Sequence, residues 1–231
     1  MIDKTCLIEN IRIRFKDGMT VMVGGFGVPG TPFTLIDALL ANGACGLTLI
    51  KNEANEDHMG LSKLIEAGHA NKLITSHLGL NATVIGMMNR AEIEVEFYPQ
   101  GILAEKIRAG GAGLHGILTD IGIDTILAQN KELTTINGQR VMIEPALRAD
   151  VALIHAAAAD PFGNLIYEKS ARNFNPAMAT AAGTVIVETE RLVALGELEP
   201  DMIHTPGGFV DHVVVLDQLS DEYGILEHHV L

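Results

Sequence analysis

Apolar residues in this chain form short runs separated by amphipathic stretches, a pattern typical of strands that alternate with helices. The runs that predict buried strands in the first half lie at 19–23, 46–50, 72–76 and 93–98. The stretches that predict helices between them lie at 32–41, 58–68, 81–90 and 101–109. Because such helices serve as crossovers between neighbouring strands, this half of the chain predicts a parallel sheet.

The pattern changes in the middle of the chain, where two short apolar runs flank Asn137-Gly138. This dipeptide is a strong hairpin signal, so we expect a small antiparallel insert around 130–145. Parallel-type strands are predicted again at 151–155, 165–167, 184–187 and 210–216, with a helix at 176–182. The predicted fold class is therefore α/β, an open and mainly parallel sheet flanked by helices.

The two ends of the chain have patterns of their own. Residues 1–16 predict an amphipathic helix that carries Ile8, Ile11 and Phe15 on one side. Residues 217–231 are polar and acidic, which favours a surface tail. Because no stretch between them has the composition of a linker, we predict a single domain over 1–231.

The composition of the chain limits the classes of function that it can have. The net charge of −13 argues against binding to nucleic acid or to an anionic membrane surface. Cys6 and Cys45 are the only cysteines, so we expect free thiols rather than a disulfide framework. The chain has neither a run long enough to span a membrane nor the apolar region of a signal peptide, so the expected location is the cytoplasm. The nine histidines form no metal-binding motif, and no metal site is expected.

The candidate chemistry begins at 17–32, DGMTVMVGGFGVPGTP, where an apolar run leads into a glycine loop. Thr31 is predicted to cap the following helix, with Pro32 as its first residue. Loop amides and the unpaired N–H groups of a helix N-terminus attract anions, so the stretch predicts a ligand-binding loop. The loop residues are Gly24, Gly25, Phe26, Gly27, Val28, Pro29 and Gly30.

Residues 25–30 also match GxGxxG, the fingerprint of dinucleotide-binding enzymes. Glu53 would then be the acid that such enzymes place after the second strand, and the protein would be an NAD(P)-dependent oxidoreductase. A tight turn between strand and helix, with no ligand, explains the same glycines.

The stretch 17–32 as a whole resembles the signature of the alpha subunit of family I coenzyme A transferases. The matching positions are Asp17, Gly18, the apolar run 21–23, Gly24, Gly25, Phe26, Gly30 and Pro32. Further stretches that resemble blocks of the same family lie at 98–113, 160–165, 169–176 and 206–212. The resemblance extends from about residue 8 to about residue 215, and it is greatest to the short-chain acyl and 3-oxoacid types.

This resemblance implies a CoA-transferase fold of the NagB-RpiA-like kind and the transfer of CoA between a short-chain acyl-CoA and a carboxylic acid. The implied acyl groups are acetyl, butyryl, acetoacetyl and succinyl, as in short-chain fatty acid and ketone body metabolism. In the family, a glutamate of the beta subunit attacks the thioester and then carries CoA as a glutamyl thioester. The chain is therefore expected to need a beta subunit, in an A2B2 heterotetramer, with CoA as a substrate and no permanently bound cofactor.

The resemblance also assigns supporting residues. It makes 24–30 the CoA-side binding loop and places Gln100 near the substrate carboxylate, where an amide can donate to a developing oxyanion. Asn52 follows the second strand as Gln100 follows the fourth, and both are expected at the carboxyl edge of the sheet. The family often has Ser-Asn-Asn where this chain has 51–55, Lys-Asn-Glu-Ala-Asn. The cations expected to meet phosphate or carboxylate are Lys51, Arg108, Lys169 and Arg172.

Structural alternatives remain for each of these residues. Gln100 could stabilise its loop, and each cation could lie at the surface or in an ion pair. A third hypothesis for the whole chain is a non-catalytic acyl-CoA-binding module of the same fold.

Overall fold

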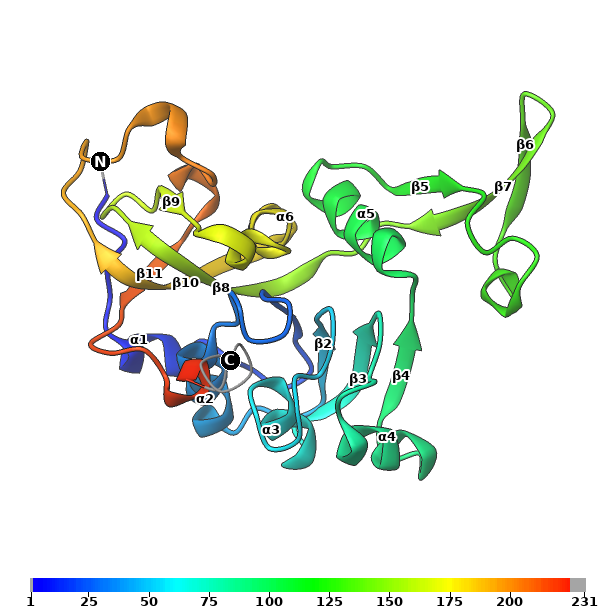
Figure 1. Cartoon of the computed structure of the whole chain (residues 1–231), viewed down its shortest axis with the longest axis horizontal. Coiled ribbons are helices and arrows are strands. Elements are labelled where there is room, and N and C mark those ends of the chain that lie inside the picture. Colours follow the sequence, from blue (N-terminus) through cyan, green and yellow to red (C-terminus); the bar gives the residue numbers. More distant parts are fainter. Residues whose placement is uncertain (1, 225–231) are drawn as a thin grey trace.

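One eight-stranded sheet organises the protein in the computed structural model, which describes residues 2–224 (Figure 1). Seven strands follow the order β11-β10-β8-β1-β2-β3-β4 and pair in parallel. Their bounds are Thr20–Val23 (β1), Leu47–Ile50 (β2), Ala70–Thr75 (β3), Glu94–Phe97 (β4), Ala149–Ala159 (β8), Ala182–Leu192 (β10) and His212–Val215 (β11). The eighth, β9 (Leu165–Ile166), is antiparallel to β8.

Helices cover both faces of this sheet. They are α1 (Ile8–Arg12), α2 (Phe33–Asn42), α3 (Leu61–Glu66), α4 (Ala82–Asn89), α5 (Gln100–Gly111) and α6 (Asn175–Thr180). Side chains alternate between the two faces along each strand. In β1, Val21 and Val23 pack in the core under α1 to α4, whereas Met22 packs in the core under α5 and α6.

A second, three-stranded antiparallel sheet projects from the main body (green, at the right of Figure 1). Its strands are β5 (Gly116–Thr119), β6 (Leu133–Ile136) and β7 (Gln139–Pro145), in the order β5-β7-β6. Asn137 and Gly138 both have positive φ, 51° and 82°, as a two-residue hairpin turn requires. The sheet is joined to α5 by a buried ion pair between Lys106 and Glu144, 2.7 Å apart.

The order of the strands places a switch point beside β1. From β1 the chain builds β2, β3 and β4 outward on one side, and later β8, β10 and β11 outward on the other. The connections that leave the carboxyl ends of β1 and β8 therefore diverge. Open α/β sheets bind their ligands in the crevice between two such diverging connections. The glycine loop 24–30 follows β1 directly.

The predicted α/β class, parallel sheet and antiparallel insert are confirmed. The predicted helix over 1–16 is wrong outside 8–12, because Lys4 and Cys6 exchange backbone hydrogen bonds with Val213 of β11. The expected parallel pairing at 165–167 is also wrong, since β9 folds back on β8. Strand β5 has no counterpart among the strands that the sequence pattern predicts.

Among the described residues, no helix has the length and apolar character needed to cross a membrane.

Candidate active site

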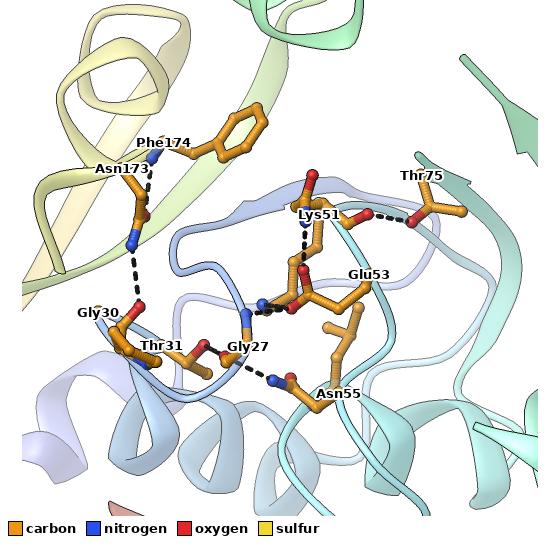
Figure 2. A network of polar contacts seen from close by, with 12 residues as sticks. Gly27, Gly30, Thr31, Lys51, Glu53, Asn55, Thr75, Asn173 and Phe174 are labelled. Atoms are coloured by element: carbon orange, nitrogen blue, oxygen red, sulfur yellow. Dashed lines mark hydrogen bonds and ion pairs between the residues drawn. The ribbon is translucent and has the colours of Figure 1, made fainter. Parts of the chain in front are cut away.

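The glycine loop 24–30 is held from two sides (Figure 2). On one side, Asn173 Nδ2 donates to Pro29 O at 2.9 Å and Asn175 Nδ2 donates to Gly30 O at 3.0 Å. On the other side, Glu53 and Asn55, from the segment after β2, bond to Gly27. Segments distant in the sequence therefore fix the shape of the loop.

Close packing explains two of the glycines. A Cβ on Gly24 would lie 1.9 Å from Asn175 Oδ1. Gly30 has a φ of +74°, and a Cβ there would lie 2.4 Å from the backbone oxygen of Ala171. No larger residue fits either position without displacing the segment that carries Asn173 and Asn175.

The backbone N–H and the backbone carbonyl of Gly27 both form hydrogen bonds. Its N–H donates to Glu53 Oε1 at 3.0 Å, and its carbonyl accepts from Thr31 Oγ1 at 2.7 Å and from Asn55 Nδ2 at 2.9 Å. Glu53 is buried and also accepts from Lys51 Nζ and from the neighbouring asparagine amide. The loop thus contacts a buried carboxyl group, that of Glu53, supplied by the segment after β2.

Asn52 and Gln100, predicted separately from the ends of β2 and β4, meet in the structure. Gln100 Nε2 donates to Asn52 Oδ1 at 2.9 Å, and Ser76 Oγ donates to the same oxygen at 2.9 Å. Asn52 Nδ2 donates to Glu53 Oε2 at 2.6 Å. Since Glu53 bonds to Gly27, one continuous network joins the exposed Gln100 to the glycine loop.

The predicted anion site at the helix N-terminus is corrected by the structure. Helix α2 begins at Phe33, and Thr31 does not cap it but donates to Gly27 O. The first turn of α2 is satisfied by a carboxylate of β10, because Leu35 N donates to Glu188 Oε2 at 2.9 Å. The helix end therefore already faces a carboxyl group of the protein itself.

Three amides of the glycine loop are not engaged by the network. Within 2–224, no hydrogen bond engages the N–H groups of Gly25, Val28 and Gly30. Phe26, at the tip of the loop, is 44% exposed. Gly25, Val28 and Gly30 are buried, so the exposed Phe26 ring is the part of the loop that could contact a bound molecule directly.

The candidate cations separate into three kinds. Lys51 has no exposed surface and pairs with Glu53, so it cannot reach a phosphate in solution. Arg108 pairs with Glu105 on the exposed face of α5. Lys169 and Arg172 are exposed at the start of the segment that holds the glycine loop.

A buried histidine that sequence patterns did not reveal lies under the site. His155 Nδ1 lies 2.9 Å from Glu188 Oε1, and its Nε2 lies 3.1 Å from Glu190 Oε1. Burial lowers the pKa of His155, but the hydrogen bonds to the two glutamates outweigh burial and raise it to about 9. Tyr223 packs against this imidazole and donates to Thr31 O at 2.6 Å, so the segment around Tyr223 covers the cluster.

Residues 2–224 bring together no group of three or more His, Cys, Asp or Glu side chains that could hold a metal ion.

A family model described as coenzyme A transferase matches residues 5–216. The chain belongs to the coenzyme A transferase family. This transferase chain is 50% identical over 212 residues to the alpha subunit of a probable coenzyme A transferase of Bacillus subtilis, covering 91% of this chain and 93% of that protein. It is 48% identical over 201 residues to the alpha subunit of an acetate CoA-transferase of Escherichia coli, covering 87% of this chain and 91% of that one.

Solved structures agree on the fold of this transferase chain. An acyl-CoA transferase from Escherichia coli O157:H7 superposes with a TM-score of 0.85 at 24% identity. The match covers 95% of this chain but only 48% of the other, so this chain spans about half of that longer polypeptide. At this identity the likeness concerns the fold alone.

The dinucleotide hypothesis is not supported. It requires Glu53 to bond to a ribose, but Glu53 is buried and accepts from Lys51, Asn52 and Gly27. The relatives are named as transferase subunits, which likewise does not favour the non-catalytic module.

Proposed function

We propose that this chain is the alpha subunit of a two-chain coenzyme A transferase that moves CoA between a short-chain acyl-CoA and a carboxylic acid. The observation that carries the proposal is the network from Gln100 through Asn52 and Glu53 to Gly27, at the switch point of the sheet. It links an exposed amide donor to the glycine loop in a member of the CoA transferase family.

The chain's own residues would bind and orient the substrates. The glycine loop 24–30 would contact the CoA side through the exposed Phe26 at its tip, with Lys169 and Arg172 as exposed cations for phosphate. Gln100 would donate to the substrate carboxylate or to the oxyanion that develops when the thioester is attacked. Asn52 would hold Gln100 in place.

The nucleophile would come from the beta subunit. Glu53 is the carboxylate that touches the loop, but it is buried and three donors bond to it, so its lone pairs are engaged. A glutamate of the beta subunit would attack the thioester, releasing CoA as thiolate and forming an acyl anhydride. The thiolate would attack the glutamyl carbonyl and release the first carboxylate, leaving a glutamyl-CoA thioester. A second carboxylate would attack that thioester and release the CoA thiolate, forming a new anhydride. Attack of the thiolate on the acyl carbonyl of this anhydride would give the new acyl-CoA and free the glutamate.

The proposed assembly is an A2B2 heterotetramer in the cytoplasm, with CoA as a substrate and no permanent cofactor. The acyl group would be acetyl, butyryl, acetoacetyl or succinyl. The relative from Escherichia coli is named for acetate, which makes acetate the first acceptor to test.

The test is a CoA-transfer assay with acetyl-, butyryl-, succinyl- and acetoacetyl-CoA against the matching acids. It is run on this chain alone, on the beta chain alone and on the co-expressed pair. We expect activity only in the pair, because the proposed site takes groups from both chains. Transfer by this chain alone at ordinary enzymatic rates would contradict the division of labour, and no transfer by a pair that assembles would contradict the proposed function.

A further inference from the structure

The segment after β2 buries an unusual run of polar side chains. Lys51, Asn52, Glu53 and Asn55 are each no more than 5% exposed. Burying a charged group is costly unless it is paired and hydrogen-bonded. Such a run is stable only if its partners are well placed, so the contacts of each side chain are informative.

Glu53 receives donors from three directions. Its Oε1 accepts from Lys51 Nζ and from the N–H of Gly27, and its Oε2 accepts from Asn52 Nδ2. Burial lowers the pKa of the Lys51 ammonium, and the Glu53 carboxylate opposes that shift. The pair therefore supports itself electrostatically while its carboxylate faces two groups of the candidate site.

The carboxylate determines which way the Asn52 amide points. An ionised carboxylate only accepts hydrogen bonds, so Asn52 must turn its NH₂ group toward Glu53. Its oxygen is then directed to Gln100 and Ser76, which both donate to it. The Gln100 side chain is thereby oriented, because its NH₂ group, and not its oxygen, must face the accepting oxygen of Asn52.

The same carboxylate fixes the glycine loop. Gly27 has a φ of +62°, and its N–H points at Glu53 while its carbonyl bonds to Thr31 and Asn55. Without an acceptor at Glu53, this N–H would lose its partner and the turn could rotate. One buried group thus contacts both halves of the site.

We propose that the Lys51–Glu53 ion pair is a positioning device, in which Glu53 orients Gln100 through Asn52 and holds the Gly27 turn, while Lys51 holds the Glu53 carboxylate in place by donating to its Oε1. This inference rests on the proposed function, since it gives Glu53 its role in the same site. Glu53 touches no substrate in this account, and it acts through residues that do.

The first variant is Glu53→Gln in the co-expressed pair of chains. The new amide at position 53 has one accepting and one donating end, so it cannot satisfy donors on both sides. Either the Gly27 N–H loses its acceptor, or the Asn52 amide turns over and drives Gln100 out of place. We expect kcat, per folded enzyme, to fall by about ten- to a hundredfold, the loss typical of a misplaced reacting group, with a smaller change in KM.

A second variant separates positioning from stability. Lys51→Met combined with Glu53→Gln removes both charges at nearly constant volume, so no unpaired ion stays buried. We expect the urea midpoint to recover toward that of the wild type while kcat stays low. If kcat recovers together with stability, the pair is only structural and the inference is wrong. Glu92→Gln, which removes a carboxylate from an exposed ion pair with Arg90, is the matched control and should leave kcat unchanged.

A double-mutant cycle of Glu53→Gln with Gln100→Ala tests whether Glu53 acts through Gln100. If Glu53 acts through Gln100, adding Glu53→Gln to the Gln100→Ala enzyme should lower kcat by a smaller factor than it does in the wild type, because the oriented group is already gone and only the effect on the Gly27 turn is left. An equal fold-loss in both backgrounds would overturn the inference while leaving the proposed function intact. A wild-type pair that transfers no CoA would instead overturn the proposed function, and this inference with it.

Discussion

At the scale of single residues, the candidate site depends on amides rather than on charges. Gln100 and Asn52 are uncharged, and Lys51, the cation of the same network, is buried against Glu53. An amide donor can stabilise a developing oxyanion without attracting a solvent counter-ion, which suits a chain with a net charge of −13. The proposed contact with the oxyanion therefore needs no positive charge of its own.

Removing the Gln100 amide tests this view. We expect Gln100→Ala to lower kcat of the assembled enzyme by roughly ten- to a thousandfold, a range that includes the loss of one oxyanion donor. Gln139→Ala is the matched control, because Gln139 Nε2 also donates to a side-chain oxygen, on Asp120, but lies on the projecting sheet. Kinetics for Gln100→Ala equal to those of the control would reduce Gln100 to a loop-stabilising residue.

The glycine loop offers a test of stability by comparison of two glycines with the same φ. Gly30 and Gly18 both have a φ of +74°, but a Cβ meets Ala171 O at Gly30 and nothing within 4 Å at Gly18. We expect Gly30→Ala to lower the free energy of unfolding by about 2–5 kcal/mol and Gly18→Ala by only about 1 kcal/mol. Urea denaturation of both variants gives the comparison, and equal losses would show that the close approach to Ala171 is easily relaxed.

How far the sequence predicts individual residues depends on the range of their contacts. That Gln100 and Asn52 lie at one edge of the sheet is predictable, because each follows a strand and parallel strands bring such positions together. The partners of Glu53 and Glu188 are not predictable, because each carboxylate bonds to a backbone N–H from a distant part of the chain. The prediction that Thr31 caps α2 is wrong because the Thr31 hydroxyl donates to the carbonyl of Gly27 instead.

At the scale of elements, local pattern predicts most strands and helices. The alternation of short apolar runs with amphipathic stretches is sufficient for β1 to β4 and α2 to α5, and Asn137-Gly138 is sufficient for the hairpin. Strand β5 escapes prediction because its apolar run is only two residues long, Ile117 and Leu118, and follows a cluster of glycines, so the run is too short to indicate a buried strand. The opening helix is shorter than predicted because pairing of Lys4 and Cys6 with β11 overrides local propensity.

The attachment of the projecting sheet to α5 gives a prediction at this scale. Lys106 and Glu144 are 2% and 1% exposed, and Lys131 also pairs with Glu144. We expect Glu144→Gln to lower the free energy of unfolding by about 3–5 kcal/mol, because it leaves a buried ammonium without its counter-ion. Glu105→Gln, in an exposed pair on the same helix, should cost less than about 1 kcal/mol. Similar losses in the two variants, measured in urea, would contradict the idea that burial decides the cost.

At the scale of the whole molecule, His155 joins β8, β10 and the segment around Tyr223. Because Glu188 and Glu190 raise its pKa to about 9 from an ordinary value near 6.5, the protonated form stabilises the fold. That contribution is complete below about pH 6.5 and is lost as pH rises through about 9. It amounts to about 3 kcal/mol, from about 1.4 kcal/mol per pKa unit.

The expected result is a free energy of unfolding that falls between about pH 6.5 and 9 more steeply in the wild type than in His155→Gln. Urea denaturation at several pH values measures both slopes, and the difference between them isolates His155 from other groups that titrate in this range. Parallel curves for the two proteins would show that His155 has the same pKa folded and unfolded.

The central position of β1 has a consequence for how the protein is made. Thr20, at the start of β1, donates to Asp150, 130 residues later, and β8 is the second neighbour of β1 in the sheet. A ribosome that releases β1 to β4 therefore exposes a sheet with an open edge at β1 until it has also synthesised the projecting sheet and β8. Open edges pair with other chains, so nascent molecules would aggregate most readily in this interval. The yield of soluble protein should then depend on the speed of translation between β4 and β8 and on chaperones that shield the edge of β1.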